Sequence, residues 1–405
     1  MPHHQFFRIL PLFLVIFFDT ISGTLIGPIL PALFVEGPAS ILPADMSSQI
    51  RYFLFGLTGA IFFIALFFSS PVLGDLADCK GRKKIIFISL IGAFIGYLLS
   101  VISVEFHAVS LLLLGRIIAG LTAGSISAAK AAVIDISTDE TRTTNIGYVL
   151  LALSLGTIVG PLISGVLSNS HWVSWFNLST PLYAAAILSL INAIYLQYGF
   201  KEDYIPVSKP ISLSSGLTAF FSSFITPDIR GLALSFFFLQ LGWSIYVQFI
   251  SLYLNLQYKF NPHEIGIYMG LTGVGFALAF CYILTFLTKH FSLRHIALVT
   301  MSFIVIAISA IVSANTVNIA WALCIPAATS LAISYSVLIS LFSEAVSKDK
   351  QGWIMGVSGA IGAFAFGISG LIAGVLVDIN IAAPLWAAII LLFFAIISIS
   401  HQDKS

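Results

Sequence analysis

The chain has 405 residues, of which 59% are hydrophobic and 9% are charged, whereas a soluble domain carries roughly 25% charged residues. These few polar groups cannot cover the surface of a soluble fold of this size, so the composition predicts an integral membrane protein. The net charge of +1 and the single basic run, 80–84, exclude a nucleic-acid partner. Three scattered cysteines, Cys79, Cys281 and Cys324, predict neither a disulfide framework nor a metal site. No cofactor is expected.

Twelve apolar runs follow one another along the chain, each close to the length of about 20 residues that crosses a bilayer as a helix. They predict an all-α membrane protein with twelve transmembrane helices. The runs cover residues 7–34, 49–71, 84–103, 108–134, 144–168, 178–198, 229–256, 263–288, 295–314, 319–342, 351–376 and 384–400.

Lys and Arg are distributed unevenly among the loops between these runs. When the N-terminus is placed inside the cell, fourteen of the eighteen Lys and Arg fall in cytoplasmic segments, and only Arg51 and Lys259 fall outside. Because cytoplasmic loops carry the excess of positive charge, both termini are predicted to be cytoplasmic.

The first run contains Asp19, the one acidic residue that lies clearly at mid-depth among the predicted spans. Burial disfavours the charged form of a carboxyl group, so a carboxyl group at this depth can take up and release a proton near neutral pH. Asp19 is therefore a candidate proton carrier. The alternative is a structural hydrogen bond to backbone groups freed by Gly23, Gly27 and Pro28.

The loop between the second and third runs has a distinctive pattern. It reads Gly74-Asp75-Leu76-Ala77-Asp78-Cys79-Lys80-Gly81-Arg82-Lys83-Lys84. This resembles the signature of the major facilitator superfamily, Gly-x-Leu-x-Asp-basic-x-Gly-Arg-basic, with Cys79 at a usually basic position. The resemblance implies two pseudo-symmetric six-helix bundles around a central cavity that opens alternately to each side of the membrane. The alternative is a loop that is basic only because it is cytoplasmic.

Four residues of this loop and one distant acid form the predicted cytoplasmic gate. Gly74 permits a close approach of helices, and Gly81 permits a tight turn. Asp78 can interact with the positive N-terminus of a neighbouring helix. Arg82 can pair with Asp135, at the cytoplasmic end of the fourth run.

The fourth run carries two cations. Arg116, with Gly120 four positions later, is similar to the second motif of the family. An Arg inside a span costs several kcal/mol unless it is paired or faces water, so Arg116 is predicted to face the bundle interior and to serve proton coupling. Lys130 lies fourteen residues on, about four helical turns, and is predicted to share that face and line a substrate cavity. Alternatively, Arg116 only ties helices together, and Lys130 pairs locally or snorkels.

The fifth run contains Gly156, Gly160, Pro161 and Gly165 in the pattern Gly-x-x-x-Gly-Pro-x-x-x-Gly. This pattern resembles a motif that the family associates with antiporters. Gly156 and Gly160 predict a strip of small residues for close helix packing, and Pro161 predicts a bend. The Gly-x-x-x-Gly part alone is common in membrane helices that merely pack together.

The longest polar interval separates six runs from six. It predicts an N-terminal six-helix bundle over 1–198, a cytoplasmic linker over 199–228 and a C-terminal six-helix bundle over 229–405. The hexapeptides 162–167 and 371–376 match at an offset of 209 residues, and a basic loop recurs at the same offset. Two features at one offset favour a duplicated six-span unit.

The seventh run presents an amide and aromatic side chains near one face. Gln240, Trp243 and Tyr246, together with Phe236, predict a strip that can line a cavity for a flat or amphiphilic molecule. In a chain so rich in aromatic residues, the same strip can also serve packing alone.

The resemblance also implies a function. The segment in which Asp19 precedes Gly27 and Pro31 is similar to the first span of drug:proton antiporters of the tetracycline-efflux type. A proton-coupled secondary transporter that exports an amphiphilic compound is therefore expected, and not an enzyme. The expected partners are a small-molecule substrate, protons and the lipid bilayer. A monomer in a bacterial inner membrane is expected.

Two alternatives remain at this point. The inferred cavity holds two cations, Arg116 and Lys130, and one acid, Asp19, so its net charge is positive. A positive cavity suits a carboxylate metabolite, imported or exported. An intramembrane serine protease is a remote alternative, because 367–370 fits Gly-x-Ser-Gly, but no histidine at membrane depth is available as its base. An ATP-driven pump lacks a phosphate-binding loop, and nothing indicates a channel filter.

Overall fold

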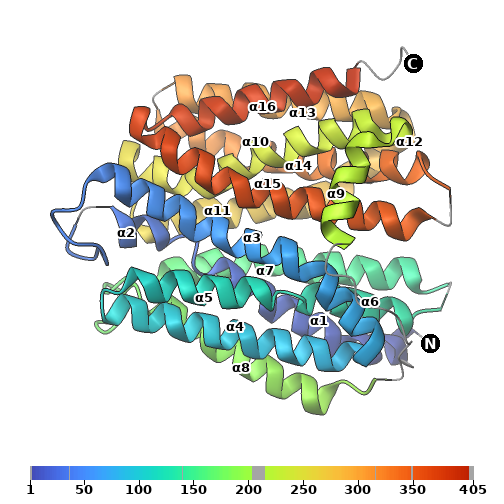
Figure 1. Cartoon of the computed structure of the whole chain (residues 1–405), viewed down its shortest axis with the longest axis horizontal. Coiled ribbons are helices and arrows are strands. Elements are labelled where there is room, and N and C mark those ends of the chain that lie inside the picture. Colours follow the sequence, from blue (N-terminus) through green and yellow to red (C-terminus); the bar gives the residue numbers. More distant parts are fainter. Residues whose placement is uncertain are drawn as a thin grey trace. The chain divides into compact units, whose positions relative to one another are not determined.

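The structure, a computed structural model, describes residues 2–35, 37–138, 140–202, 215–314, 316–347 and 350–400. Residues 203–214, inside the predicted linker, lie outside the described residues. The described chain is helical and contains no strand (Figure 1). Its elements are α1 (Pro2–Thr24), α2 (Leu30–Phe34), α3 (Ser48–Lys80), α4 (Arg82–Glu105), α5 (Val109–Leu121), α6 (Ser125–Asp135), α7 (Arg142–Leu167), α8 (Thr180–Gly199), α9 (Ser215–Ile225), α10 (Pro227–Tyr258), α11 (Pro262–Leu278), the π-helical η1 (Ala279–Ile283), α12 (Leu284–His290), α13 (Leu293–Ser313), α14 (Val317–Glu344), α15 (Gln351–Ile379) and α16 (Ala383–Ser400).

The prediction of an all-α membrane protein is confirmed. Among the described residues, eleven helical stretches are long and apolar enough to cross a membrane, and Ile9–Thr24 is a shorter apolar helix that corresponds to the first predicted run. In hydrocarbon every backbone polar group needs a partner within the protein, so apolar runs of this length form helices.

Some predicted spans are interrupted. The single helix expected over 108–134 is divided into α5 and α6 by a turn in which the Gly124 amide donates to the Thr122 carbonyl at 2.7 Å. Gly124 suits this turn because a Cβ atom there would lie 2.9 Å from the Leu73 side chain. The interruption changes the direction in which the later residues of this span point.

Contacts divide the chain into two compact units. Unit 1 comprises the described parts of 1–44, 68–213 and 262–270. Within it α1 packs against α6, α7 and α8, and α4 packs against α5, α6 and α8. The α4–α5 contact is close because the helices meet at two glycines, where a Cβ atom on Gly96 would lie 2.7 Å from the Gly115 carbonyl oxygen.

Unit 2 comprises the described parts of 45–67, 214–261 and 271–405. Here α10 packs against α9, α15 and α16, and α13 packs against α14 and α16. The side chains of Phe236, Tyr246, Phe249 and Phe342 are fully or almost fully buried. The core of unit 2 is therefore formed largely by α10, which is buried on most sides, together with residues such as Phe342 of α14.

Two helices, α3 and α11, contribute residues to both units. The division by contacts therefore differs from a single cut of the chain at the predicted linker. The first half of α3 belongs to unit 2, where a Cβ atom on Gly374 of α15 would lie 3.1 Å from the Tyr52 carbonyl oxygen. The first residues of α11 belong to unit 1, where a Cβ atom on Gly165 of α7 would lie 3.0 Å from the His263 Cα atom. Close contacts at glycines thus pack the first half of α3 into unit 2 and the first residues of α11 into unit 1.

Candidate functional site

Asp19 lies in α1 of unit 1 and faces the start of α6. The Ser125 hydroxyl group donates a short hydrogen bond to its carboxylate. Ser125 is buried and Asp19 is half-buried. Ser125 is the first residue of α6, so the turn that ends α5 places its hydroxyl group beside Asp19. Because that turn contains no proline, sequence reasoning did not identify Ser125.

Two further residues of unit 1, Tyr97 and Arg116, are linked electrostatically to Asp19, Arg116 by way of Tyr97. The buried Tyr97 of α4 has its hydroxyl group within electrostatic range of the Asp19 carboxyl and Arg116 guanidinium groups. Arg116 lies in α5 and is only 9% exposed. Asp19, Tyr97, Arg116 and Ser125 are hereafter called the Asp19 site. It combines a carboxyl group that can exchange a proton, hydroxyl groups that can hydrogen-bond to it, and a cation.

Lys130 differs from Arg116 in the exposure of its side chain. Its side chain, in α6, is exposed, whereas Arg116 is buried. The expectation of a common face assumed one continuous helix, and the turn at 122–124 breaks that phase. A spacing of fourteen residues therefore does not by itself place the two side chains on one face, and the position of Lys130 in a substrate cavity stays a prediction.

The predicted cytoplasmic gate is assembled around Arg82. Its guanidinium group contacts the Asp78 carboxylate at 2.6 Å and the Asp135 carboxylate at 3.2 Å. The Arg82 side chain is 13% exposed, whereas the side chains of Asp78 and Asp135 are 32% and 29% exposed. This geometry ties the end of α3 to the end of α6 through one cation.

The start of the linker contacts the same loop. Gly81 has a φ of +94°, a conformation that suits glycine, and a Cβ atom there would lie 2.7 Å from the Glu202 carboxylate. That carboxylate accepts a short hydrogen bond from the Arg82 backbone amide, at the N-terminus of α4. Lys83 donates to the carbonyls of Gln197 and Phe200, at 2.8 and 2.6 Å, at the end of α8.

Sequence reasoning missed Glu202, and its expectation for Gly74 is not met. The only feature of the sequence that could have indicated Glu202 is its negative charge, which complements the basic loop. Glu202 lies far from that loop along the chain. A Cβ atom on Gly74 would meet no heavy atom of the described residues within 4 Å. Gly74 therefore mediates no close helix contact in this structure.

The glycines of α7 pack against α1 beside the Asp19 site. A Cβ atom on Gly156 would lie 2.6 Å from the Thr20 Cβ atom, and one on Gly160 would lie 2.9 Å from the Ile21 carbonyl oxygen. Pro161 follows at a contact with Gly266 of α11. Thr20 directly follows Asp19, so this strip determines how closely α7 approaches the segment that carries the carboxyl group.

The polar and aromatic strip of α10 is buried in unit 2. Gln240, Trp243 and Tyr246 are 8%, 5% and 1% exposed. The rings of Trp243 and Tyr246 stack with their centroids 5.1 Å apart, and the Gln240 amide faces Gly362 of α15. In this structure the strip packs tightly, and its role in a substrate cavity remains a prediction.

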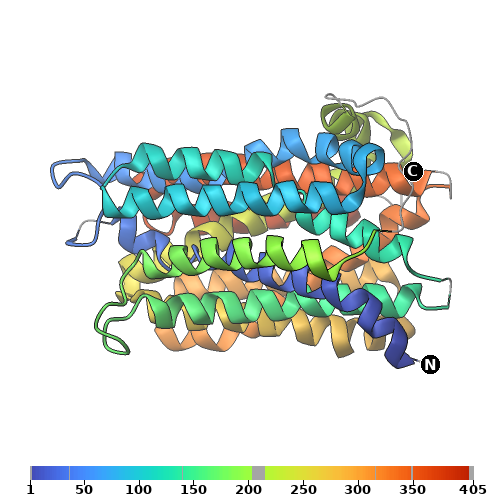
Figure 2. The same cartoon turned by 90° about the horizontal axis from the view of Figure 1, so that it is seen from below.

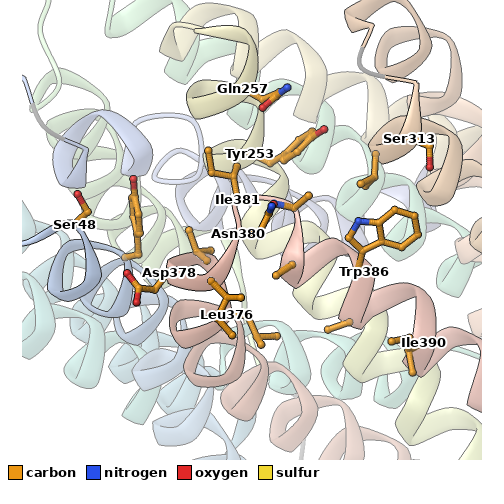
Figure 3. A pocket seen from close by; sticks show the side chains of 17 residues that line it. Ser48, Tyr253, Gln257, Ser313, Leu376, Asp378, Asn380, Ile381, Trp386 and Ile390 are labelled. Atoms are coloured by element: carbon orange, nitrogen blue, oxygen red, sulfur yellow. The ribbon is translucent and has the colours of Figure 1, made fainter.

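A cavity of about 1070 Å³ lies in unit 2, where α3, α10, α13, α15 and α16 end or begin. Figure 3 shows Ser48, Tyr253, Asp378, Asn380 and Trp386 around it. Its lining does not include the strip of α10. Of the described residues, Asp378 is the only charged one that lines this cavity, so their side chains present aromatic rings and one carboxylate.

Ser369 is the candidate protease nucleophile. Among the described residues, none of its hydrogen bonds is to a group that could act as a base. Its hydroxyl group is fully buried, donates to the Phe366 carbonyl at 2.9 Å and accepts from the Gln248 amide at 2.6 Å. A side-chain amide cannot act as the general base that a serine nucleophile requires. Ser369 therefore joins α15 to α10.

Known proteins of similar sequence and fold are transporters or resistance proteins. The quinolone resistance protein NorA of Staphylococcus aureus is 28% identical over 345 residues, which are 82% of this chain and 83% of NorA. The class C tetracycline resistance protein of Escherichia coli is 24% identical over 85% of this chain and 83% of its own length.

Solved structures share the fold at low sequence identity. The nucleoside transporter NupG has a TM-score of 0.76 at 15% identity and covers 97% of this chain and 98% of its own. The human organic anion transporter MFSD10 has a TM-score of 0.72 at 19% identity and covers 98% and 99%. The chain is thus a multi-pass integral membrane protein and not an enzyme. Residues 12–370 match the Major Facilitator Superfamily, and the chain belongs to that family of transporters.

Proposed function

We propose that this transporter exports an amphiphilic small molecule in exchange for protons, by alternating access. The Asp19 site carries the proposal, because a half-buried carboxyl group that accepts a hydrogen bond from Ser125 and lies within electrostatic range of Tyr97 has the chemistry of a proton carrier. The named activities of the relatives, quinolone and tetracycline resistance, support efflux. We further propose a monomer in a bacterial inner membrane with both termini in the cytoplasm.

In the proposed cycle, Asp19 takes up a proton on the outer side and releases it on the inner side. Protonation removes the negative charge of Asp19 within range of Tyr97, and it lets the carboxyl group donate as well as accept a hydrogen bond at Ser125. The contact of α7 with Thr20 joins this change to the helix that carries the antiporter-like motif. Uptake and release of the proton at Asp19 are thereby coupled to export of the substrate.

Purified protein in sealed vesicles tests this function. An imposed pH gradient should drive movement of an amphiphilic substrate, and an ionophore that collapses the gradient should stop it. A panel of lipophilic cations, neutral amphiphiles and carboxylates identifies the substrate class. The same rate with and without the gradient would contradict proton coupling.

A second candidate is transport of a small anionic metabolite. Unit 1 holds the buried Arg116 and the exposed Lys130 against the one acidic group of the Asp19 site. Two cations against one acid give these groups a net positive charge, which attracts carboxylates more readily than cations.

The substitution Lys130→Gln distinguishes these two candidates. If the substrate is anionic, loss of this charge should weaken its binding by at most a few kcal/mol, the scale of a hydrogen bond to a charged group. If the substrate is a lipophilic cation, binding should be unchanged or tighter. The affinities of wild type and variant for matched anionic and cationic ligands measure the difference. Weaker binding of the cation alone would reject the anion candidate.

The gate around Arg82 gives a second test of mechanism. Charge reversal at Arg82 or at Asp135 should each lower transport severalfold, because like charges would then face each other. The double reversal should restore only part of the rate, since an acid at position 82 would also face Asp78. Lys84→Glu, in the same loop and exposed, is the control for net charge. Normal transport by Arg82→Ala at low and high salt would show that the pair is not a gate.

A further inference from the structure

The short helix α9, in the predicted linker, has an apolar surface that its neighbours only partly cover. Phe220 is 6% exposed. Leu217, Phe221 and Ile225 are 36%, 59% and 76% exposed. Spaced by four residues, these three lie along one side of the helix. They are hereafter called the α9 stripe.

Aromatic contacts hold α9 against three spans of unit 2. The Phe220 ring lies 4.4 Å from that of Phe364 in α15, 6.1 Å from that of Phe67 in α3 and 6.4 Å from that of Phe237 in α10. These edge-to-face and tilted pairs have favourable geometry. The position of α9 relative to α10 and α15 is therefore defined by packing as well as by the chain that joins α9 to α10.

The helix lengths indicate the depth of these contacts. At 1.5 Å per residue, Phe237 lies about 15 Å along α10 from its first residue, and Phe364 about 20 Å along α15 from its first residue. The two helices have 32 and 29 residues, and both are longer than the hydrocarbon core of a bilayer, about 30 Å. A helix of either length that is centred in the core extends roughly 7 to 9 Å beyond it at each end. Phe220 therefore contacts the spans below the lipid headgroups.

The direction of α9 fits that depth. Figure 1 shows α9 running across α15, and in the view of Figure 2, turned by 90°, α9 is seen nearly end-on. A helix that crosses spanning helices runs along the membrane plane. Its Thr218 side chain, next to the α9 stripe, is exposed, so a polar edge accompanies the exposed apolar one.

The buried Phe220 of α9, next to the α9 stripe, is connected by ring contacts to exposed aromatic residues of α16. Phe237 contacts Phe238 at 5.7 Å, and Phe238 contacts Phe394 of α16 at 5.6 Å. Phe393 and Phe394 are 55% and 46% exposed on this apolar span. Aromatic side chains thus continue from α9 to residues that only acyl chains can cover in a membrane-spanning helix.

We infer that α9 is an in-plane membrane helix whose stripe of Leu217, Phe221 and Ile225 lies among the acyl chains of the leaflet at the N-terminal end of α10. In-plane helices bury their apolar face about 5 to 10 Å into the boundary between headgroups and acyl chains, which agrees with the depth above. The exposed Arg230, in the first turn of α10, is placed to contact anionic headgroups. In the proposed orientation this leaflet is the cytoplasmic one.

Spin labelling of the full chain in liposomes of phosphatidylethanolamine and phosphatidylglycerol tests the inference without any transport measurement. Single cysteines at positions 221 and 225 carry the label after Cys79, Cys281 and Cys324 are replaced. Both labels should be reached severalfold better by oxygen, which dissolves in acyl chains, than by a water-soluble nickel chelate. A label at position 393 on α16 is the lipid-facing control, and one at Thr218 should show the reverse preference.

Other occupants would give other results. Labels at 221 and 225 that the nickel chelate reaches as well as it reaches position 218 would place the stripe in water and overturn the inference. Labels protected from both reagents would mean that protein covers the stripe, and spin–spin broadening would identify a second copy. If the cysteine-free protein does not fold, a photoreactive diazirine residue at position 221 in the native chain replaces this test. Its adduct should contain phospholipid, and an adduct with protein only would overturn the inference.

Discussion

Replacing Asp19 by asparagine is expected to abolish transport driven by a pH gradient. Asparagine keeps the shape of the side chain and a hydrogen bond with Ser125 but cannot exchange a proton. Substrate accumulation in vesicles should fall to the level of protein-free vesicles. Substrate binding to the purified variant should remain within a few fold of wild type, because the proposed role of Asp19 is to carry the proton.

Control variants separate this role from a structural one. Asp45→Asn removes an exposed carboxylate and should leave gradient-driven transport unchanged, whereas Asp19→Glu should retain part of it. Ser125→Ala and Tyr97→Phe should alter the pH dependence of the rate without abolishing transport. Undiminished gradient-driven transport by a well-expressed Asp19→Asn protein would refute the assignment. Loss of substrate binding in that variant would show that Asp19 holds the substrate.

Gly160→Leu is expected to be the most damaging packing substitution in α7. Even the Cβ atom would overlap the Thr24 hydroxyl group and lie 2.9 Å from the Ile21 carbonyl oxygen. The threonine side chain can rotate, but the backbone carbonyl cannot, so α7 and α1 must separate. Overpacking of this kind costs about 3 kcal/mol, the upper end of its usual range. The melting temperature in detergent should fall clearly, and transport should be lost.

The same helix offers a matched control for this prediction. A Cβ atom on Gly147 would meet no heavy atom of the described residues within 4 Å. Gly147→Leu should therefore leave stability unchanged or raise it by up to about 1 kcal/mol, the difference in helix propensity. Thr24→Ala should only partly rescue Gly160→Leu, because the Ile21 carbonyl remains. Equal melting temperatures for the two glycine variants would contradict a specific contact of α7 with α1.

Hydropathy alone predicted most of the membrane architecture. Runs of about 20 apolar residues have few alternatives to a helix in a bilayer, so the predicted spans correspond to helices. The loop around Arg82 also allowed its contact with the distant Asp135 to be predicted. In each case the information is local or resides in a motif with defined spacing.

The remaining features depend on how helices are interrupted and turned, which residue patterns do not reveal. The turn at 122–124 contains no proline, yet it brings Ser125 to Asp19 and interrupts the helix between Arg116 and Lys130. Partners such as Glu202 are remote in sequence, and only packing brings them to the same place. The sequence therefore determines which segments enter the membrane, because burial depends on composition, whereas tertiary packing alone decides which polar groups meet, because each pair depends on helix rotation and approach.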